Sequence, residues 1–314
     1  MCSIESANGP LSDEQGQIPD VYEMPAPIVA GEAVEVSPGV HVIPDHRVPL
    51  VPNVGIVVGE RAALVVDTGI GPRNGAHVLE QARELAKDRP LYLTTTHFHP
   101  EHAFGAQAFK GAATIVYNAA QRDEIHRKGQ AYLGMFKSFS PVIATELEPV
   151  ELVDPDLVYH GSAEIDLGGT RVTLRSVGPA HSAGDQIILV DDRVVFTGDL
   201  VEHRMFVLAP YFPPFDTDSD VSRWIGLLDE MLGLGAEVIV PGHGEIAENS
   251  IDDVRGYLDY VRAEATRLHV QGVSADEAAA AIDHAARDRW SNWDNPEWIT
   301  FVANAFYRIA AQAA

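Results

Sequence analysis

Three histidines and one glutamate crowd into six consecutive positions, and this cluster constrains the chain more than any other feature of its sequence. The segment reads HFHPEH. It follows a β-rich run in which side chains alternate between two faces, so His97 and His99 are expected to point the same way. Pro100 then turns the chain and brings Glu101 and His102 beside them. Neutral imidazoles with a nearby carboxylate bind zinc, iron or manganese, so the segment predicts a metal site.

Further single residues stand in turns that follow predicted strands elsewhere in the chain. They are His181 in GPAHSAGD, Asp199 in FTGD and His243 in PGHG. The neighbouring glycines let the backbone approach a metal closely. Each of these residues alone is more typical of an ordinary turn, but beside a histidine cluster they are candidate ligands.

Short β-rich runs and helical patterns alternate in both halves of the chain, which predicts an α/β fold. Strands are predicted at 33–43, 54–58, 62–66, 91–96, 171–177, 186–190, 194–197 and 237–240. Helices are predicted at 74–87, at 119–136, from about 219, and throughout the region of about 250–314, where Ser274 to Glu277 forms a capping-box pattern. Residues 1–27 are predicted to be a poorly ordered tail, and residues 28–314 a single domain.

The charge balance limits the partners of the protein. Lys and Arg number 22 against 46 Asp and Glu, a formal net charge of −24. Such a chain repels phosphate backbones and anionic bilayers, so neither a nucleic acid nor a membrane is expected as a partner. A small anionic substrate stays open because a bound metal inverts the local field. We expect a small-molecule substrate, and a homo-oligomer is compatible with the sequence.

Cysteine content and hydropathy bear on the compartment. The single cysteine, Cys2, excludes an intramolecular disulfide and a thiolate metal site. No secretory signal and no run of 18 apolar residues is visible, so a cytoplasmic protein is expected.

Taken in order, these residues resemble the signature of the metallo-β-lactamase superfamily. That signature consists of Asp at a strand end, His-x-His-x-Asp-His, a lone His, a further Asp and a final His. The matching positions are Asp67, 97–102, His181, Asp199 and His243. The resemblance covers roughly residues 33–250. The phrases HFHPEHAFG and VIVPGHG, with NPEW and NAFYR near the end, are most similar to the glyoxalase II-like branch.

The resemblance implies a four-layer αββα sandwich with a helical C-terminal addition and with metals at one edge between the sheets. It implies one metal on His97, His99 and His181, a second on His102 and His243, and a bridging Asp199. Asp67 would hold a ligand histidine in its tautomer. Two zinc ions per chain are therefore expected, with iron and manganese as alternatives.

Glu101 departs from the signature, which has an aspartate at this position. The glutamate has the same charge on a side chain one methylene longer. If Glu101 binds the second metal, its loop must retreat by about one carbon–carbon bond. Otherwise the second site is weak, and Glu101 is free to act on the water as a base.

The activity that follows is metal-dependent hydrolysis. A metal-bound water, with Glu101 and Asp199 as catalytic residues, would attack the carbonyl of an ester, thioester, lactone or lactam. The main alternative is a mononuclear-iron, persulfide dioxygenase-like enzyme of the same fold. A di-iron oxygen-reducing enzyme lacks room for its flavodoxin-like partner domain, and the charge disfavours a nuclease. A non-catalytic module would hold metal with no open coordination position.

Two loops are expected to form the walls of the substrate pocket, residues 45–53 and 205–215. The aromatic residues of the second loop suggest an apolar or aromatic substrate; equally, they could cap the core or form a dimer contact. These residues are Phe206, Tyr211, Phe212 and Phe215. His46 and His203 lie in candidate rim loops, where a solvated or hydrogen-bonded structural role is favoured. The loops carry no cluster of Arg or Lys for a glutathione carboxylate.

Overall fold

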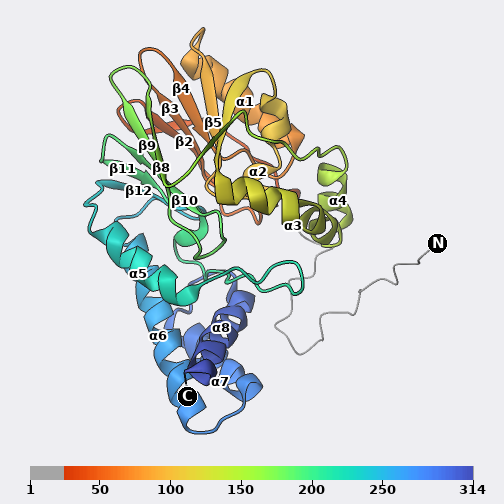
Figure 1. The fold of residues 1–314 in the computed structure, drawn as a ribbon, viewed down its shortest axis with the longest axis vertical. Helices are drawn as coiled ribbons and strands as arrows, with labels where there is room; N and C mark the ends of the chain where they lie inside the picture. Colours follow the sequence, from red (N-terminus) through yellow and green to blue (C-terminus); the bar gives the residue numbers. More distant parts are fainter. Residues whose placement is uncertain (1–24, 314) are drawn as a thin grey trace, which may run out of the picture.

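The computed structural model describes residues 25–313. Two β-sheets lie in the upper part of the view with helices on their outer faces, and the C-terminal helices gather below them (Figure 1). Most of the predicted tail, residues 1–24, lies outside the described residues, as does Cys2. The tail and the division into one domain therefore stay predictions.

The first sheet contains seven strands that are neighbours in the order of the sequence. They are β1 (Val34–Ser37), β2 (Val40–Ile43), β3 (Val54–Val58), β4 (Ala63–Val66), β5 (Leu91–Thr94), β6 (Ala113–Asn118) and β7 (Leu157–Tyr159). Strands β1 to β4 pair antiparallel, and β4 to β7 pair parallel. The predicted run 33–43 is thus a hairpin rather than one strand, and Gly39 takes the positive φ of 72° that its turn requires.

The second sheet has five strands in the order β12-β11-β10-β9-β8. They are β8 (Ser162–Asp166), β9 (Arg171–Ser176), β10 (Gln186–Val190), β11 (Val194–Phe196) and β12 (Val238–Val240). Strands β8 to β11 pair antiparallel, whereas β11 and β12 run parallel. The carboxyl ends of β4 and β5 in the first sheet, and of β11 and β12 in the second, carry the residues singled out in the sequence.

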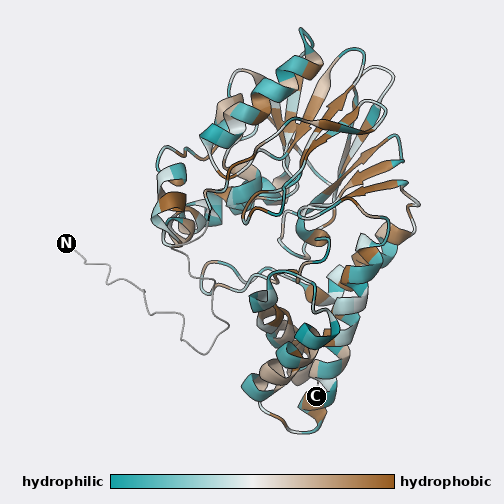
Figure 2. Ribbon diagram, turned by 180° about the vertical axis from the view of Figure 1, so that it is seen from behind, coloured by the Kyte–Doolittle hydropathy of each residue, from teal (hydrophilic) through white to brown (hydrophobic). Residues whose placement is uncertain are grey.

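Alternating side chains assign each sheet one face toward helices and one toward the other sheet. In β4, Val65 packs with the helices of the first half, whereas Leu64 packs between the sheets. In β10, Ile187 packs toward the later helices and Ile188 packs between the sheets. Figure 2 shows these strands as mainly hydrophobic and the outer helices as mixed. The predicted αββα sandwich is therefore confirmed.

The outer layers are amphipathic helices. The first sheet is covered by α1 (Pro72–Ala86), α3 (Ala119–Lys137) and α4 (Pro141–Leu147), and the second by α5 (Val221–Leu232). The last part of the described chain forms α6 (Ser250–Val270), α7 (Ala275–Arg289) and α8 (Ile299–Gln312), which pack together beside α5 (Figure 1). The capping box at Ser274 and Glu277 is present, so the predicted helical addition is confirmed.

Candidate metal centre

The histidine cluster occupies a sharp bend between β5 and a very short helix, α2 (Pro100–Ala103). Strand β5 ends at Thr94, two residues earlier than predicted, because the backbone N–H of Thr96 donates to the Asp67 carboxylate at 2.7 Å and leaves the ladder. His99 precedes the helix, and Pro100 takes its first position, where a missing N–H costs nothing. Glu101 and His102 therefore stand on the first turn of α2.

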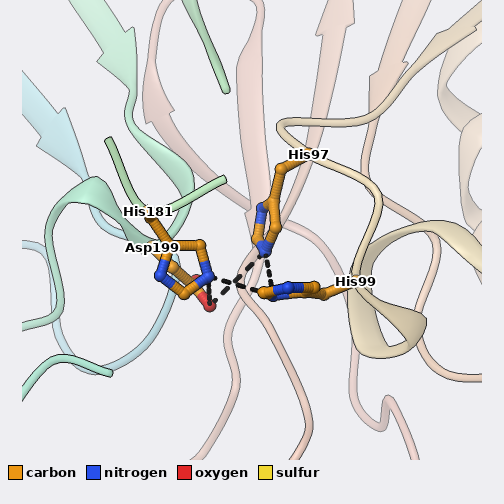
Figure 3. Close-up of side chains that lie close together, drawn as sticks. All are labelled: His97, His99, His181 and Asp199. Carbon is orange, nitrogen blue, oxygen red and sulfur yellow. Dashed lines mark hydrogen bonds and ion pairs between the residues drawn. The ribbon is translucent and has the colours of Figure 1, made fainter. Parts of the chain in front are cut away.

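A first ligand group consists of His97, His99, His181 and Asp199, whose side chains converge from three separate turns or bends (Figure 3). His99 Nδ1 lies 3.0 Å from His97 Nε2 and 3.0 Å from His181 Nε2. Asp199 Oδ2 lies 3.7 Å and 3.8 Å from the same two Nε2 atoms. One proton cannot satisfy three facing imidazole nitrogens, whereas a central cation can accept a lone pair from each.

A second ligand group consists of Glu101, His102, Asp199 and His243. Asp199 contributes its other oxygen, Oδ1, which lies 3.1 Å from His102 Nε2 and 3.6 Å from His243 Nε2. The Asp199 carboxylate therefore stands between the two groups with one oxygen toward each. The structure thus brings together all seven residues that the sequence and the resemblance singled out as ligands.

Three buried atoms of the second ligand group make no well-aligned hydrogen bond among the described residues, although two of them face each other at 3.1 Å. They are Glu101 Oε2, His102 Nε2 and Asp199 Oδ1. An unsatisfied buried polar atom costs about 1–3 kcal/mol, so a protein seldom retains three together without a ligand. Imidazole and carboxylate donors suit zinc, iron or manganese, so these residues fit metal ions at both groups.

Each ligand histidine is held from its far side. His102 Nδ1 contacts Asp67 Oδ2 at 2.9 Å, which is the orienting role expected for Asp67. The four other ligand histidines contact two backbone carbonyls and two hydroxyls. The pairs are His181 Nδ1 with Leu208 O, His243 Nδ1 with Val51 O, His97 Nδ1 with Thr96 Oγ1, and His99 Nε2 with Tyr132 Oη. Such contacts fix the tautomer that leaves a lone pair facing the metal.

The electrostatics of the centre suit metal ligation. Burial lowers the pKa of His97 and of His99 well below the ordinary range, and neighbouring histidines add to the effect, so both rings are neutral. Burial alone would lower the pKa of His102, but Asp199 and Asp67 on either side outweigh it and raise that pKa. Burial raises the pKa of Glu101. The carboxylates therefore favour positive charge between the two groups, which a metal cation supplies.

Two glycines allow the backbone to come close to Asp199. A Cβ atom on Gly242 would lie 2.2 Å from Asp199 Oδ1, and one on Gly198 would lie 2.6 Å from Thr96 Cβ. Gly198 also takes a positive φ of 52°. Both positions therefore need glycine for Asp199 to reach the place between the two ligand groups.

A cavity of about 640 Å³ opens directly onto both ligand groups, and we call it the site cavity. The predicted loops contribute part of its wall, including Pro49, Leu50, Met205, Leu208 and Phe212. Other walls come from segments that the sequence did not point to. These are Tyr132, Met135, Phe136 and Phe139 on or after α3, Glu202 after η2 (Gly198–Leu200), and residues 293–298 before α8.

Three of the four aromatic residues predicted to line the pocket do not line it. The prediction is wrong for Phe206, which is buried in the helical core against Tyr257. The prediction is also wrong for Tyr211, which lies at the surface with Arg308 over its ring. Phe215 stacks behind Phe212, which alone of the four faces the site cavity. Aromatic content along one loop cannot tell which side chains face inward, because the loop has no regular periodicity.

His46 and His203 are outside both ligand groups and outside the cavity lining. His203 is buried, and its Nδ1 contacts Ser250 Oγ at 3.2 Å. Burial lowers its pKa, so the ring is a neutral hydrogen-bonded residue. Arg47, next to His46, lines the cavity mouth, where Glu245 and Asp294 both pair with it.

An αββα sandwich with two buried histidine–carboxylate groups sharing one aspartate defines the class of protein: a metal-dependent hydrolase. The family model described as the metallo-beta-lactamase superfamily matches residues 47–243. The chain belongs to that superfamily. Its place in the glyoxalase II-like branch stays a prediction.

Curated relatives match part of the sequence, and solved structures share the fold. An acyl-coenzyme A thioesterase, MBLAC2, of Homo sapiens is 28% identical over 208 residues, covering 61% of this chain and 72% of the relative. A linear primary-alkylsulfatase of a Pseudomonas strain is 24% identical over 259 residues, covering 70% and 47%.

Among solved structures, the inverting sec-alkylsulfatase Pisa1 from Pseudomonas has a TM-score of 0.64 at 14% identity, covering 88% of this chain and 50% of its own. A metallo-beta-lactamase from Pontibacter korlensis has a TM-score of 0.53 at 16% identity, covering 72% and 98%. The chain thus spans about half the length of the alkylsulfatases. Within residues 25–313, no helix has the length and apolar character needed to cross a membrane.

Proposed function

We propose that this chain hydrolyses the carbonyl ester or thioester of a small molecule with an apolar acyl group, and that lactones and lactams are further substrates to be tested. One observation carries the proposal: the site cavity joins the metal centre to an apolar wall. His99, Glu101 and Asp199 stand at its base, and Phe136 and Trp298 stand in its wall. A carbonyl at the base would place its acyl chain along that wall.

Metal ions supply the reactive chemistry. A divalent ion held by these residues would lower the pKa of a coordinated water and polarise a carbonyl oxygen. The chain itself holds the ligands, excludes bulk water through its apolar wall, and places Asp199 between the two groups. Glu101, with one buried oxygen unpaired, either completes the second group or takes a proton from the water. We propose two zinc ions per chain.

The charges around the site cavity bear on the group that leaves. Asp45, Glu202, Asp294 and Glu297 line it, and among the described residues its one arginine or lysine is Arg47, already paired with Glu245 and Asp294. A neutral leaving group therefore suits the mouth better than a phosphorylated or sulfated one. The relatives named as a coenzyme A thioesterase and an alkylsulfatase support the thioester and make alkyl sulfate the comparison substrate.

The experiment is a chain-length series. The value of kcat/KM is measured for neutral straight-chain thioesters and esters of increasing acyl length, together with one lactone, one lactam and one alkyl sulfate. We expect kcat/KM to rise by about threefold or more per added methylene until the wall is filled. Trp298→Ala should flatten this rise, because it removes part of the wall.

Trp290→Ala is the matched control, since Trp290 packs in the helical core outside the cavity lining. It should leave the chain-length profile unchanged. A kcat/KM for carbonyl substrates that does not change with acyl length, or hydrolysis of the alkyl sulfate alone, would overturn the proposed substrate class. Elemental mass spectrometry on the same preparation gives the metal: one iron per chain with no hydrolysis would favour the persulfide dioxygenase-like alternative instead.

A further inference from the structure

A lysine is buried beside the metal centre, together with three carboxylates. Lys128 on α3 has a side chain 1% exposed. Its Nζ lies 2.6 Å from Glu124 Oε1, 2.7 Å from Asp216 Oδ1 and 3.0 Å from Asp218 Oδ2. Burial on its own lowers the pKa of Lys128, but Glu124 and Asp216 outweigh it and raise that pKa, so the lysine is charged. We call these residues with Tyr132 the Lys128 network.

One branch of the Lys128 network reaches His99. The Tyr132 hydroxyl donates to Asp216 Oδ2, so its oxygen is left as an acceptor. His99 Nε2 lies 3.2 Å from that oxygen, and the two rings stack with centroids 4.9 Å apart. A carboxylate can only accept, so Asp216 fixes the direction of the Tyr132 proton. That direction in turn requires the proton of His99 on Nε2 and its lone pair on Nδ1, toward the first ligand group.

The other branch reaches the turn that carries His181. Glu124 Oε1 accepts from the backbone N–H of Ala183 at 3.1 Å, and Oε2 accepts from that of Gly184 at 2.6 Å. Both amides follow His181 within three residues. The turn has no room to shift toward α3, because a Cβ on Gly184 would lie 2.5 Å from the Gln121 Cα atom.

We propose that Lys128, Glu124, Asp216 and Tyr132 are positioning residues that together set two ligands of the first group, His99 through its tautomer and His181 through its turn. Lys128 is the hub, because its ammonium group pairs with both of the carboxylates from which the branches start. Replacing a buried ion cluster by apolar residues is often neutral for stability, so stability alone does not account for its place beside the centre. The inference concerns metal binding and stands whichever substrate is hydrolysed.

The test is metal binding by Tyr132→Phe and Glu124→Gln. The first removes one hydroxyl and keeps the ring. Glu124→Gln keeps the shape of the side chain but replaces one accepting oxygen by an NH₂ group. That NH₂ group would face Lys128 or the backbone N–H groups of the His181 turn, which are themselves donors. Tyr257→Phe is the matched control, because it removes the same atom from a fully buried tyrosine whose hydroxyl has no partner among the described residues. Stepwise zinc affinity is measured by competition with a chromophoric chelator, and the absorption spectrum of the cobalt form reports ligand geometry.

We expect Tyr132→Phe to weaken one of the two metal sites by about 10- to 100-fold and Glu124→Gln by about 10-fold. Both should alter the cobalt spectrum and lower kcat, and both should leave the far-ultraviolet circular dichroism unchanged. Tyr257→Phe should match the parent protein in all three measurements. If Tyr132→Phe does not fold, Glu124→Gln decides the outcome alone.

Three results would overturn the proposal. The first is parental metal affinity and spectrum in both variants. The second is a raised KM with unchanged kcat and metal affinity in Tyr132→Phe, which would make Tyr132 only a wall of the site cavity. The third is an equal loss in Tyr257→Phe, which would indicate general loosening of the fold.

Discussion

At the scale of single residues, Glu101 stands where the signature of the superfamily has an aspartate. The structure places its carboxylate within the second ligand group, buried and with Oε2 unpaired. The longer side chain reaches this group from the first turn of α2, which begins at Pro100 directly after His99. We therefore expect Glu101 to act as a ligand rather than only as a base.

Glu101→Gln tests this role, since the amide has the same shape without the charge. We expect the metal content to fall from about two ions per chain toward one, because a neutral amide binds a divalent cation more weakly than a charged carboxylate does. The content is measured by elemental mass spectrometry after dialysis. Glu297→Gln, an acidic cavity residue outside both groups, should keep the parental content. Two ions with kcat lowered about 10²- to 10⁴-fold would instead make Glu101 a base.

Alanine substitutions at two glycines, Gly242 and Gly256, distinguish the effect of close packing at the metal centre from the effect of helix propensity. Gly242→Ala would drive a methyl group against Asp199 Oδ1, at 2.2 Å, and displace the shared carboxylate. A displacement of about 1 Å near the reacting groups can cost about 100-fold, so we expect kcat/KM to fall by at least that factor. Gly256→Ala in α6 meets nothing within 4 Å and should instead stabilise the fold by about 0.5–1 kcal/mol. Equal kcat/KM in the two variants would contradict the close approach.

Side-chain patterns predicted the ligands but not everything that holds them. The spacing of His97, His99 and His102 is unusual enough to stand out in the sequence. The partners of His181 and His243 are carbonyls of Leu208 and Val51, and a backbone oxygen has no signature in a sequence. Tyr132 and Trp298 reach the site cavity from distant segments, and only the fold brings them there.

At the scale of elements, loops at the cavity mouth are tied together by one arginine. Arg47 in the loop after β2 pairs with Glu245, which follows β12, and with Asp294, which precedes α8. It also donates to the carbonyl of His203 at 3.2 Å. These pairs are partly exposed, so they add little to stability. Their effect is to hold three connections in one arrangement around the mouth.

Arg47→Met should therefore act on binding more than on stability. We expect the free energy of unfolding to change by less than about 1 kcal/mol, while KM rises and kcat stays near its parental value. Steady-state kinetics and denaturant unfolding measure both. Arg61→Met is the control, because Arg61 forms a similar exposed pair with Asp166 away from the cavity. An unchanged KM in Arg47→Met would show that the connections hold their places without the arginine.

Secondary structure followed the sequence where the period was clear. Strands β3 and β10 have the predicted bounds, and α3 extends one residue beyond the prediction at Lys137. The strand before the histidine cluster was predicted too long, because the Asp67 side chain captures the N–H of Thr96. Competition of a side chain for a backbone donor depends on tertiary contact, which local periodicity does not contain.

At the scale of the whole molecule, the metal centre connects both sheets. His97, His99 and His102 follow β5 of the first sheet, whereas His181, Asp199 and His243 follow β9, β11 and β12 of the second. Bound metal is therefore expected to resist separation of the sheets. Stabilisation by a ligand at about 1,000 times its dissociation constant is about 4 kcal/mol.

Removal of metal should lower the melting temperature by about 10 °C in a protein of this size. Differential scanning calorimetry before and after chelation, and after zinc is added back, measures the change. His99→Ala, which lacks a ligand of the first group, should show a smaller response to the chelator. If the parent protein melts at the same temperature with and without chelator, the metal does not brace the two sheets.

The net charge of −24 acts on substrates before they reach the site, because it repels an anionic substrate and leaves a neutral one unaffected. An anionic ester or thioester meets an acidic mouth, so added salt should screen the repulsion and raise its kcat/KM. A neutral ester with the same acyl group should respond little. The measurement compares both substrates between about 0.01 M and 0.15 M ionic strength, over which the screening length shortens from about 30 Å to about 8 Å. A fall of kcat/KM with salt for the anionic substrate alone would mean that the cationic centre dominates the mouth, and would move the leaving group toward phosphorylated or sulfated carriers.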